Sequence, residues 1–227
     1  FATSPVRHTP YAVRSDVVIA LESVLIEKDG YHGNKKSNRS LLDWDVVNRE
    51  RTRDVAHFWP RRGAGVDRGG KFPNSILRDT VSQVLEDMLQ KNSSLRIFTD
   101  LMGKANLVGR FSVDPAYAQA LLDFKIVVVA QKDTHEDHYR LMEALVSGAM
   151  VMSDVMLSIP TDFEDGKSIV FFRNMNELRT KIMYYLQNKA ERLSIAKMGW
   201  TIAMYRHRSW HRMEEVLFGK VLSSASV

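Results

Sequence analysis

One stretch, residues 125–154, constrains the fold of this chain more than any other. Its residues 126–130 form a short apolar run of mostly β-branched side chains, which is typical of a parallel strand buried on both faces. Thr134 and Asp137 then resemble a capping box, so a helix is expected to begin near His135. The stretch therefore predicts a buried strand followed by a helix.

The end of the same stretch predicts a second strand after that helix. Ser147 and Gly148 form the usual glycine stop of a helix, and residues 149–152 are again short and apolar. One helix between two such strands makes a βαβ unit, whose strands are parallel. Ligands of such sheets bind at the carboxyl ends of the strands, which here are residues 131–134 and 153–154.

The rest of the chain alternates short apolar runs with amphipathic segments. Further strands are expected at residues 16–20, 54–59, 95–99 and 169–172, and further helices at residues 75–91, 114–122, 176–186, 191–205 and 209–218. Residues 41–53 show no clean period, so an irregular connection is expected there. This alternation predicts an α/β fold, a doubly wound Rossmann-like parallel sheet with C-terminal helices.

Length and composition are those of a globular protein. The 227 residues can form one large domain or one and a half, and 44% of them are hydrophobic. No run approaches the roughly 18 to 20 apolar residues of a membrane helix, and the start lacks a signal peptide. Because the sequence begins with Phe1, it is interpreted as a fragment or a processed form. Its compartment stays open, either the cytoplasm or, behind an upstream targeting segment, the Golgi or ER lumen.

The charge of the chain does not point to nucleic acid. A net charge of +5 arises from 32 basic and 27 acidic residues scattered over the sequence. Nucleic-acid binders usually concentrate their basic residues on one face or arm. Here the dense clusters are limited to residues 49–53, 61–62 and 206–212. A solvated surface with a few anion contacts is favoured, and no nucleic-acid partner is expected.

No metal site is expected either. The chain has 0 cysteines, which excludes disulfides and thiolate ligands, and its 7 histidines show no HExxH spacing. Asp43 and Asp45 form a DxD pattern like that of manganese-dependent sugar transferases, but no apolar strand leads into it. Neither a GxSxG elbow nor a nucleophile with an obvious base is present, so the sequence leaves the catalytic residues unknown.

A loop rich in glycine and arginine, residues 60–74, follows the strand expected at residues 54–59. Its composition resembles a phosphate-binding loop, but the GxxxxGK[ST] and GxGxxG spacings are absent. Contact of Arg61 and Arg62 with a phosphate and simple flexibility of the loop are two open interpretations.

Polar residues form one stripe along the helix expected after residue 134. By the 3.6-residue period, this stripe contains Glu136, Arg140, Glu143 and Ser147. It is either the solvent side of the helix, with a routine Glu136–Arg140 pair, or the wall of a ligand cleft. In a cleft, a carboxylate can accept hydrogen bonds from ribose hydroxyls and the helix N-terminus can meet a diphosphate. Glu136 and Asp137 oppose bare anion binding, because they would repel a phosphate.

Residues 143–149 carry a family resemblance. They resemble the E-A-(L/M)-A-x-G segment of nucleotide-sugar glycosyltransferases with the GT-B architecture. The spacing onward is also similar, first to residues 163–166, where Asp165 and Gly166 form a turn signal, and then to the apolar residues 170–172.

The end of the chain resembles one branch of these enzymes. Residues 199–212, with His207 and Arg212, are similar to the G-x(7)-H-x(4)-R close of the spore-protein CgeB-like glycosyltransferase domain. The resemblance covers residues 117–218 well, and residues 54–110 only in their strand–helix rhythm. It implies the C-terminal half of a GT-B fold.

What the resemblance implies about function is specific. The C-terminal domain of a GT-B enzyme binds the nucleotide-sugar donor, and its N-terminal domain binds the acceptor. Glu143 would hydrogen-bond the donor ribose, and Ser147 with Gly148 would shape the pocket. Basic residues after the first core strand would face the diphosphate, for which Arg61, Arg62 and Lys71 are the candidates. Helix ends and Arg or Lys would neutralise the leaving diphosphate, so neither a metal nor another cofactor is expected.

The resemblance also divides the chain. Residues 1–51 are expected to be a remnant of the N-terminal domain with a linker, residues 52–222 the nucleotide-sugar-binding Rossmann-like domain, and residues 223–227 a frayed tail. The implied donor-binding residues are Arg61, Arg62, Lys132, His135, Glu136, Arg140, Glu143, Ser147, Gly148, Asp165 and Gly166.

One position departs from the family pattern. Many relatives carry a second glutamate eight residues before the one that matches Glu143, and here that position is His135, next to Glu136. The stereochemical course, the sugar and the acceptor therefore stay open. The leading hypothesis is a hexosyltransferase domain that, as this fragment, could bind a donor yet transfer nothing. Its rivals are a non-catalytic α/β nucleotide- or protein-binding module and a nucleic-acid-binding protein.

Overall fold

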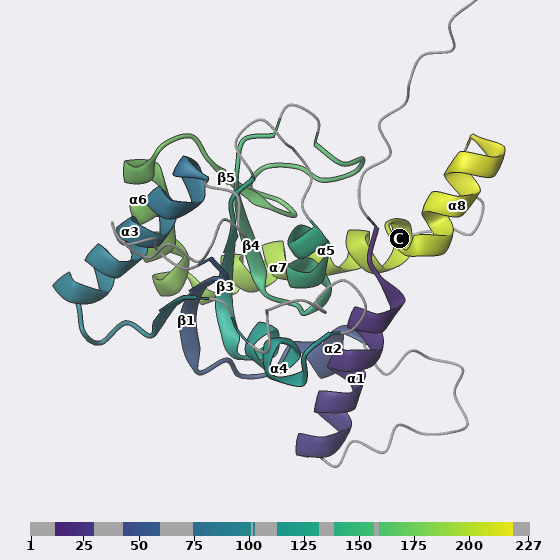
Figure 1. Cartoon of the computed structure of the whole chain (residues 1–227), viewed down its shortest axis with the longest axis horizontal. Coiled ribbons are helices and arrows are strands. Elements are labelled where there is room, and N and C mark those ends of the chain that lie inside the picture. Colours follow the sequence, from purple (N-terminus) through teal and green to yellow (C-terminus); the bar gives the residue numbers. More distant parts are fainter. Residues whose placement is uncertain are drawn as a thin grey trace, which may run out of the picture.

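A five-stranded parallel sheet forms the centre of the computed structural model, which describes residues 12–29, 43–59, 75–100, 102, 113–131, 139–156 and 159–219 (Figure 1). Its strands are β1 (Arg53–His57), β2 (Ile97–Thr99), β3 (Phe124–Val129), β4 (Met150–Asp154) and β5 (Val170–Phe172). Their order across the sheet is β2-β1-β3-β4-β5, and all neighbours are parallel. Five predicted strands are therefore confirmed, each within two residues of its predicted bounds.

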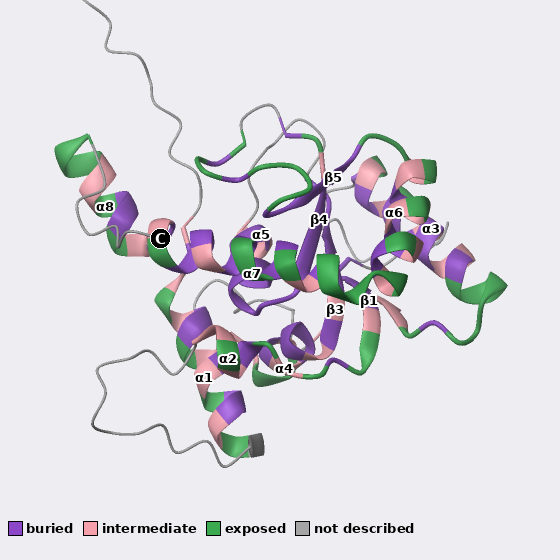
Figure 2. Ribbon diagram, turned by 180° about the vertical axis from the view of Figure 1, so that it is seen from behind, coloured by how far each residue is buried: buried purple, intermediate pink, exposed green. Residues whose placement is uncertain are grey.

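The sheet is buried on both faces. Val127 and Val129 of β3 belong to one apolar cluster, with α4 (Pro115–Asp123) and α5 (Tyr139–Val146). Ile126 and Val128 belong to the cluster on the opposite face, with α3 (Ile76–Lys91) and α6 (Met175–Gln187). Figure 2 shows the buried strands between helices whose outer sides are exposed. Because both faces are covered, the strands are continuous apolar runs rather than alternating ones.

Two long C-terminal helices complete the fold. α7 (Lys189–Arg206) contributes Ile195 to one apolar cluster and Trp200 to the other. α8 (Ser209–Phe218) projects from the end of α7 away from the sheet (Figure 1). Among the helices that the structure describes, none combines the length and the apolarity of a membrane span.

Side-chain caps explain where several helices begin. The Asp114 carboxylate accepts a hydrogen bond from the Ala116 amide, and Pro115 occupies the first turn of α4. Asn174 accepts from the Glu177 amide and starts α6 in the same way. The helices predicted at residues 114–122 and 176–186 are thereby confirmed. The helix start predicted near His135 lies outside the described residues.

The strand predicted at residues 16–20 is wrong. This segment lies in α1 (Ser15–Asp29), which packs against α4. Its buried apolar positions are Val17, Val18, Leu21, Val24 and Leu25. These positions follow the i, i+1, i+4, i+7, i+8 pattern of a helix face, which outweighs the β-branched composition of the first five residues.

The connection predicted as irregular is partly helical. Within it, residues Trp44–Val47 form the short helix α2, and residues 48–52 have no regular structure. Val47 is fully buried and belongs to the same apolar cluster as the buried residues of α1. The division of the chain at residue 52 stays a prediction.

Candidate functional site

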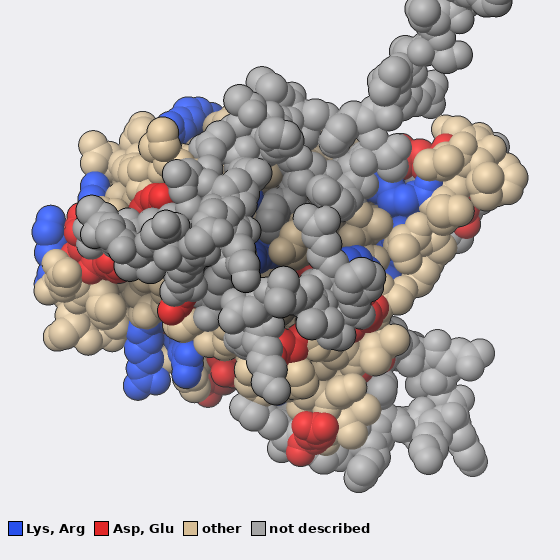
Figure 3. Space-filling model, viewed as in Figure 1, with Lys and Arg blue, Asp and Glu red and all other residues tan. Residues whose placement is uncertain are grey.

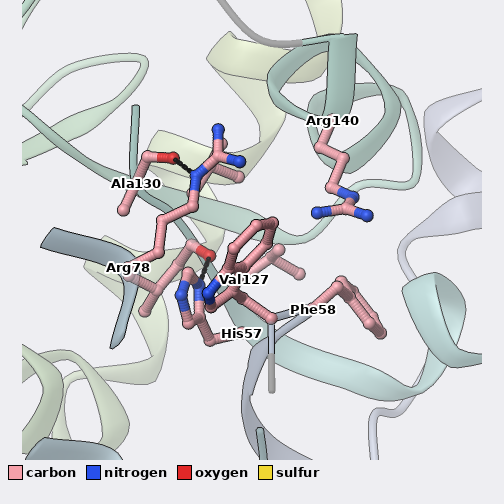
Figure 4. Close-up of a pocket in the computed structure, with 9 residues that line it drawn as sticks. His57, Phe58, Arg78, Val127, Ala130 and Arg140 are labelled. Carbon is pink, nitrogen blue, oxygen red and sulfur yellow. Dashed lines mark hydrogen bonds between the residues drawn. The ribbon is translucent and has the colours of Figure 1, made fainter. Parts of the chain in front are cut away.

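The strand order creates a crevice at one edge of the sheet. The chain passes from β1 to β2 on one side and then returns to place β3 on the other side of β1. Ligands of such sheets bind outside the carboxyl ends of the two strands where the order reverses. A pocket lies at this point, and its walls are His57, Phe58, Trp59, Arg78, residues 127–130 and Arg140 (Figure 4).

Among the residues that the structure describes, two guanidinium groups and no carboxylate line this pocket. Arg78 comes from the first turn of α3, and Arg140 extends from α5 on a different side of the pocket (Figure 4). The Arg78 Nε–H donates to the Ala130 carbonyl at 2.9 Å, and its guanidinium lies 4.8 Å from the centre of the Trp59 ring. These contacts fix a buried positive charge at the pocket, which therefore suits an anionic ligand.

His57 adds no charge to the pocket near neutral pH. Its Nδ1 lies 2.9 Å from the Val128 carbonyl oxygen. Because a carbonyl can only accept, Nδ1 carries the proton of the ring. Burial, together with the nearby charges of Arg140 and Arg78, lowers the pKa of His57 to about 4, against the raising effect of the Val128 hydrogen bond. The ring is therefore neutral, so the positive charge at the pocket comes from the two arginines.

Glu143 is buried one turn after Arg140, with 4% of its surface exposed. The Tyr117 hydroxyl donates to Glu143 Oε2 at 2.7 Å. The ring of Tyr117 meets that of Phe58 edge-on at 4.9 Å, and Phe58 lines the pocket. Burial raises the pKa of Glu143 to about 7, against the lowering effects of the Tyr117 hydrogen bond and the Arg140 charge. Since Ser147 is buried as well, the solvent interpretation of the polar stripe is wrong for these two residues.

Polar groups also gather where β3 and β4 end. The Asp154 carboxylate accepts from the Gln131 amide at 2.7 Å, and the Gln131 side chain donates to the Ser153 hydroxyl at 3.3 Å. Burial raises the pKa of Asp154, and the charge of Arg78 acts in the opposite direction. These groups lie at the carboxyl edge that the sequence predicted as the ligand side of the sheet.

Ser147 and Gly148 lie at the opposite edge of the sheet. α5 connects two parallel strands, so its first turn is near their carboxyl ends and its last turn near their amino ends. Arg51 confirms this position, because its guanidinium donates both to the Ser147 carbonyl and, at 2.9 Å, to the carbonyl of Phe124, the first residue of β3. The structure therefore does not bring Ser147 and Gly148 together with Arg140.

Asp165 and Gly166 form a bend before β5. The Asp165 carboxylate accepts from the Phe171 amide at 2.8 Å, and the Gly166 amide donates to the Ile169 carbonyl at 2.8 Å. Gly166 has a φ of +74°, which favours glycine. The predicted turn is thereby confirmed, and the predicted contact of both residues with the donor stays a prediction.

The predicted site residues Arg61, Arg62, Lys132, His135 and Glu136 lie outside the described residues. The structure adds residues that sequence reasoning missed, namely His57, Trp59, Arg78 and Tyr117. His57 and Trp59 had one available signal, since they lie among the last three residues of the strand predicted at residues 54–59. Arg78 and Tyr117 had none, because their roles depend on contacts with distant segments.

The ending that suggested the CgeB-like branch has a structural role. His207 Nε2 lies 2.9 Å from the Thr161 carbonyl, and Arg212 donates to His207 Nδ1. The His207 ring also lies 5.0 Å from that of Phe163. The contacts with Thr161 and Phe163 attach the corner between α7 and α8 to the loop before β5, and Arg212 holds the His207 ring within that corner.

Basic side chains on the described surface form separate groups. In the view of Figure 3, blue side chains near α3, below β1 and beside α8 are interrupted by acidic and other residues. This distribution agrees with the scattered charges of the sequence.

Comparisons with known proteins give a family and a fold. The model of a family described as glycosyl transferase-like matches residues 81–217, which extend from α3 into α8 and include Arg140 and Glu143. No curated protein matches the chain in sequence.

Solved structures of TarM share the architecture. One crystal structure of TarM is 16% identical, with a TM-score of 0.51 over 75% of this chain and 35% of TarM. A mutant of S. aureus TarM in complex with Fondaparinux, alpha-GlcNAc-glycerol and UDP is 18% identical, with a TM-score of 0.51 over 75% of this chain and 36% of TarM. The chain thus spans about a third of the length of TarM. The likeness confirms the predicted Rossmann-like α/β fold.

Proposed function

The chain belongs to the glycosyl transferase-like family, and from this premise we propose that it is the donor-binding half of a GT-B glycosyltransferase. The reaction is transfer of a hexose from a nucleoside diphosphate sugar to an acceptor. The observation that carries the proposal is the pocket at the carboxyl ends of β1 and β3, which has two guanidinium groups among its described wall residues and Glu143 buried beside it.

The diphosphate and the ribose of the donor have chemical counterparts at this site. The diphosphate lies against Arg78 and Arg140, whose planar donors suit phosphate oxygens. The ribose hydroxyls donate to Glu143. When the sugar leaves the diphosphate, negative charge develops on the terminal phosphate, and the fixed guanidinium groups stabilise it. Arg78 is suited to this role, because Ala130 and Trp59 hold it in place before the ligand arrives.

The nucleotide of the donor is proposed to be uridine diphosphate. Support comes from the complex of the TarM mutant with UDP, a protein with the same fold. The CgeB-like branch is proposed as well, with support from the contact between His207 and Arg212, which gives that ending a structural reason.

Donor binding without transfer is the second candidate for this chain taken alone. His57, whose pKa is lowered to about 4, is a poor general base at neutral pH, and the described residues of the pocket walls include no carboxylate. The catalytic base and the acceptor site are therefore expected in residues beyond the pocket, for example in an N-terminal domain.

Thermal unfolding with a panel of ligands tests the proposal. We expect UDP and UDP-sugars to raise the melting temperature in a concentration-dependent way, and GDP or uridine to raise it less. No stabilisation by any nucleoside diphosphate or its sugars at millimolar concentration would contradict donor binding. Release of free sugar from a UDP-sugar by the chain would then favour a transferase over a binding module.

A further inference from the structure

We propose that Tyr117 is a positioning residue for donor binding, because its hydroxyl fixes the orientation of the Glu143 carboxylate toward the donor ribose. This inference rests on the proposed function and adds to it a residue outside the resemblance that suggested Glu143. It requires that Tyr117 be held rigidly, that its contact with Glu143 be strong, and that the contact influence the charge of the carboxylate.

The start of α4 and an aromatic cluster hold Tyr117. It is the third residue of α4, whose beginning is fixed by the Asp114 cap and Pro115. Its ring meets Phe58 edge-on at 4.9 Å, and Phe58 in turn contacts Phe98 at 5.9 Å and Phe124 at 6.3 Å. The Tyr117 ring is therefore held by Phe58, which follows β1 and itself packs against Phe98 of β2 and Phe124 of β3, independently of Glu143.

The contact itself is a charge-assisted hydrogen bond between two helices. The O–H···Oε2 distance of 2.7 Å joins α4 to α5. Glu143 lies in the last half of α5, so a long, buried side chain would otherwise choose among several rotamers. The hydrogen bond from Tyr117 to one oxygen restricts this choice.

Titratable groups from several segments influence Glu143. The neutral Tyr117 comes from α4, Arg140 from α5 itself, Asp16 from the first turn of α1 and Arg14 from the residue before α1. Arg14 Nε donates to Asp16 Oδ1 at 3.0 Å, so these two opposite charges partly cancel. Burial raises the pKa of Glu143 to about 7, and the Tyr117 hydrogen bond is the largest influence that lowers it. Tyr117 thus shifts the titration of Glu143 toward the ionised carboxylate, the form that accepts hydrogen bonds from ribose hydroxyls.

Tyr117→Phe removes the hydroxyl and keeps the ring contact with Phe58. We expect wild-type affinity for UDP to fall as the pH drops through the pKa of Glu143. In Tyr117→Phe the pH at which UDP affinity falls is higher by about one unit, because a hydrogen bond to a charged group is lost. Affinity at pH 7 then falls about fivefold from charge alone and approaches the wild-type value at pH 9.

Tyr184→Phe is the matched control. The Tyr184 hydroxyl donates to Glu191 Oε2 at 2.7 Å, the same pairing, on the exposed surface of α6 and α7. Calorimetric titrations with UDP between pH 6 and 9, and ¹³C NMR titration of the Glu143 carboxyl without ligand, are carried out on all three proteins. We expect the pH at which UDP affinity falls and the midpoint of the Glu143 titration both to rise in Tyr117→Phe. Neither value should change in Tyr184→Phe.

The outcomes separate this inference from the proposed function. A wild-type pH profile of UDP binding in Tyr117→Phe overturns the role of Tyr117 alone. Absence of UDP binding by the wild-type chain overturns the proposed function and this inference with it, even where the NMR titration moves. Should Tyr117→Phe fail to fold, Tyr117→Phe is combined with Glu143→Gln, which removes the unpaired charge. We expect this double variant to bind UDP as well as Glu143→Gln alone does. A further loss of tenfold or more would contradict action through Glu143.

Discussion

The hydroxyl of Tyr117 and Oε2 of Glu143 lie 2.7 Å apart and connect residues that are 26 positions apart in the sequence. The contact ties the helix before β3 to the helix after it, next to a pocket wall formed by Phe58. It also places a carboxylate that titrates near neutral pH beside a cationic pocket, so both ligand binding and stability should depend on pH.

Glu143→Gln should change how the stability of the protein depends on pH. The pKa of Glu143 is about 7 in the folded protein and 4.5 in the unfolded chain, so the folded protein binds the extra proton between these values. Wild type therefore loses stability as the pH rises from about 5 to 8, by about 2 to 3 kcal/mol at this group, and the variant does not. Urea unfolding at pH 5 and pH 8 measures the effect, and parallel behaviour of both proteins would contradict it.

His207→Asn should show the opposite dependence. Burial, with the charge of Arg212, lowers the pKa of His207 to about 4 in the folded protein, from 6.5 in the unfolded chain. The unfolded chain alone binds the proton in this window, so wild type loses stability as the pH falls through it. The variant is less stable at pH 7, but its deficit narrows by about 2 kcal/mol at pH 5. A deficit that is the same at both pH values would show that His207 is not held neutral.

Arg51→Met should destabilise the protein by about 3 kcal/mol or more, because buried carbonyls lose their donor. Arg51 donates at 2.8 Å to the Leu121 carbonyl and at 2.9 Å to that of Phe124, at the junction where α4 meets β3. Arg173→Met is the control, since Arg173 forms an exposed pair with Glu177 worth less than about 1 kcal/mol. Denaturant unfolding of both variants measures the difference, and equal losses would contradict a structural role for Arg51.

Gly148→Ala should cost more stability than Gly166→Ala. Both glycines have a left-handed backbone, with φ of +77° and +74°. A Cβ at Gly148 would lie 3.0 Å from Val47 Cγ2 and 3.1 Å from an Arg51 nitrogen, whereas one at Gly166 meets nothing within 4 Å. We expect a loss of about 1 kcal/mol at Gly166 from backbone strain, and about 2 to 3 kcal/mol at Gly148 with the added crowding. Equal losses in thermal unfolding would show that Val47 and Arg51 move aside without cost.

Much of the fold could be predicted from sequence because the sheet is parallel and covered on both faces. Short apolar runs such as residues 126–130 then mark strands directly, and caps such as Asp114 mark the helices between them. The prediction failed at residues 16–20, where three consecutive β-branched residues resembled a strand. Only the longer pattern, which extends to Leu25, reveals the buried face of a helix.

The candidate site was less accessible to sequence reasoning. The family pattern selected Glu143, but periodicity alone could not decide whether its face meets solvent or the interior. Arg78 occupies the first turn of an amphipathic helix and would pass for a surface residue. Its burial depends on Trp59 and Ala130, which only the folded sheet brings to it. Likewise, Ser147 and Gly148 follow Glu143 closely in sequence, yet the direction of α5 carries them to the opposite edge.

The central claim is that the diphosphate of a nucleotide-sugar donor binds between the carboxyl ends of β1 and β3. Calorimetric titration of UDP and UMP into wild type, Arg140→Gln and the surface control Arg173→Gln tests it most directly. We predict that wild type and Arg173→Gln bind UDP equally and more tightly than UMP, and that Arg140→Gln loses about tenfold in UDP affinity with little change for UMP. UDP binding that is absent in wild type, or unchanged in Arg140→Gln, would contradict the claim.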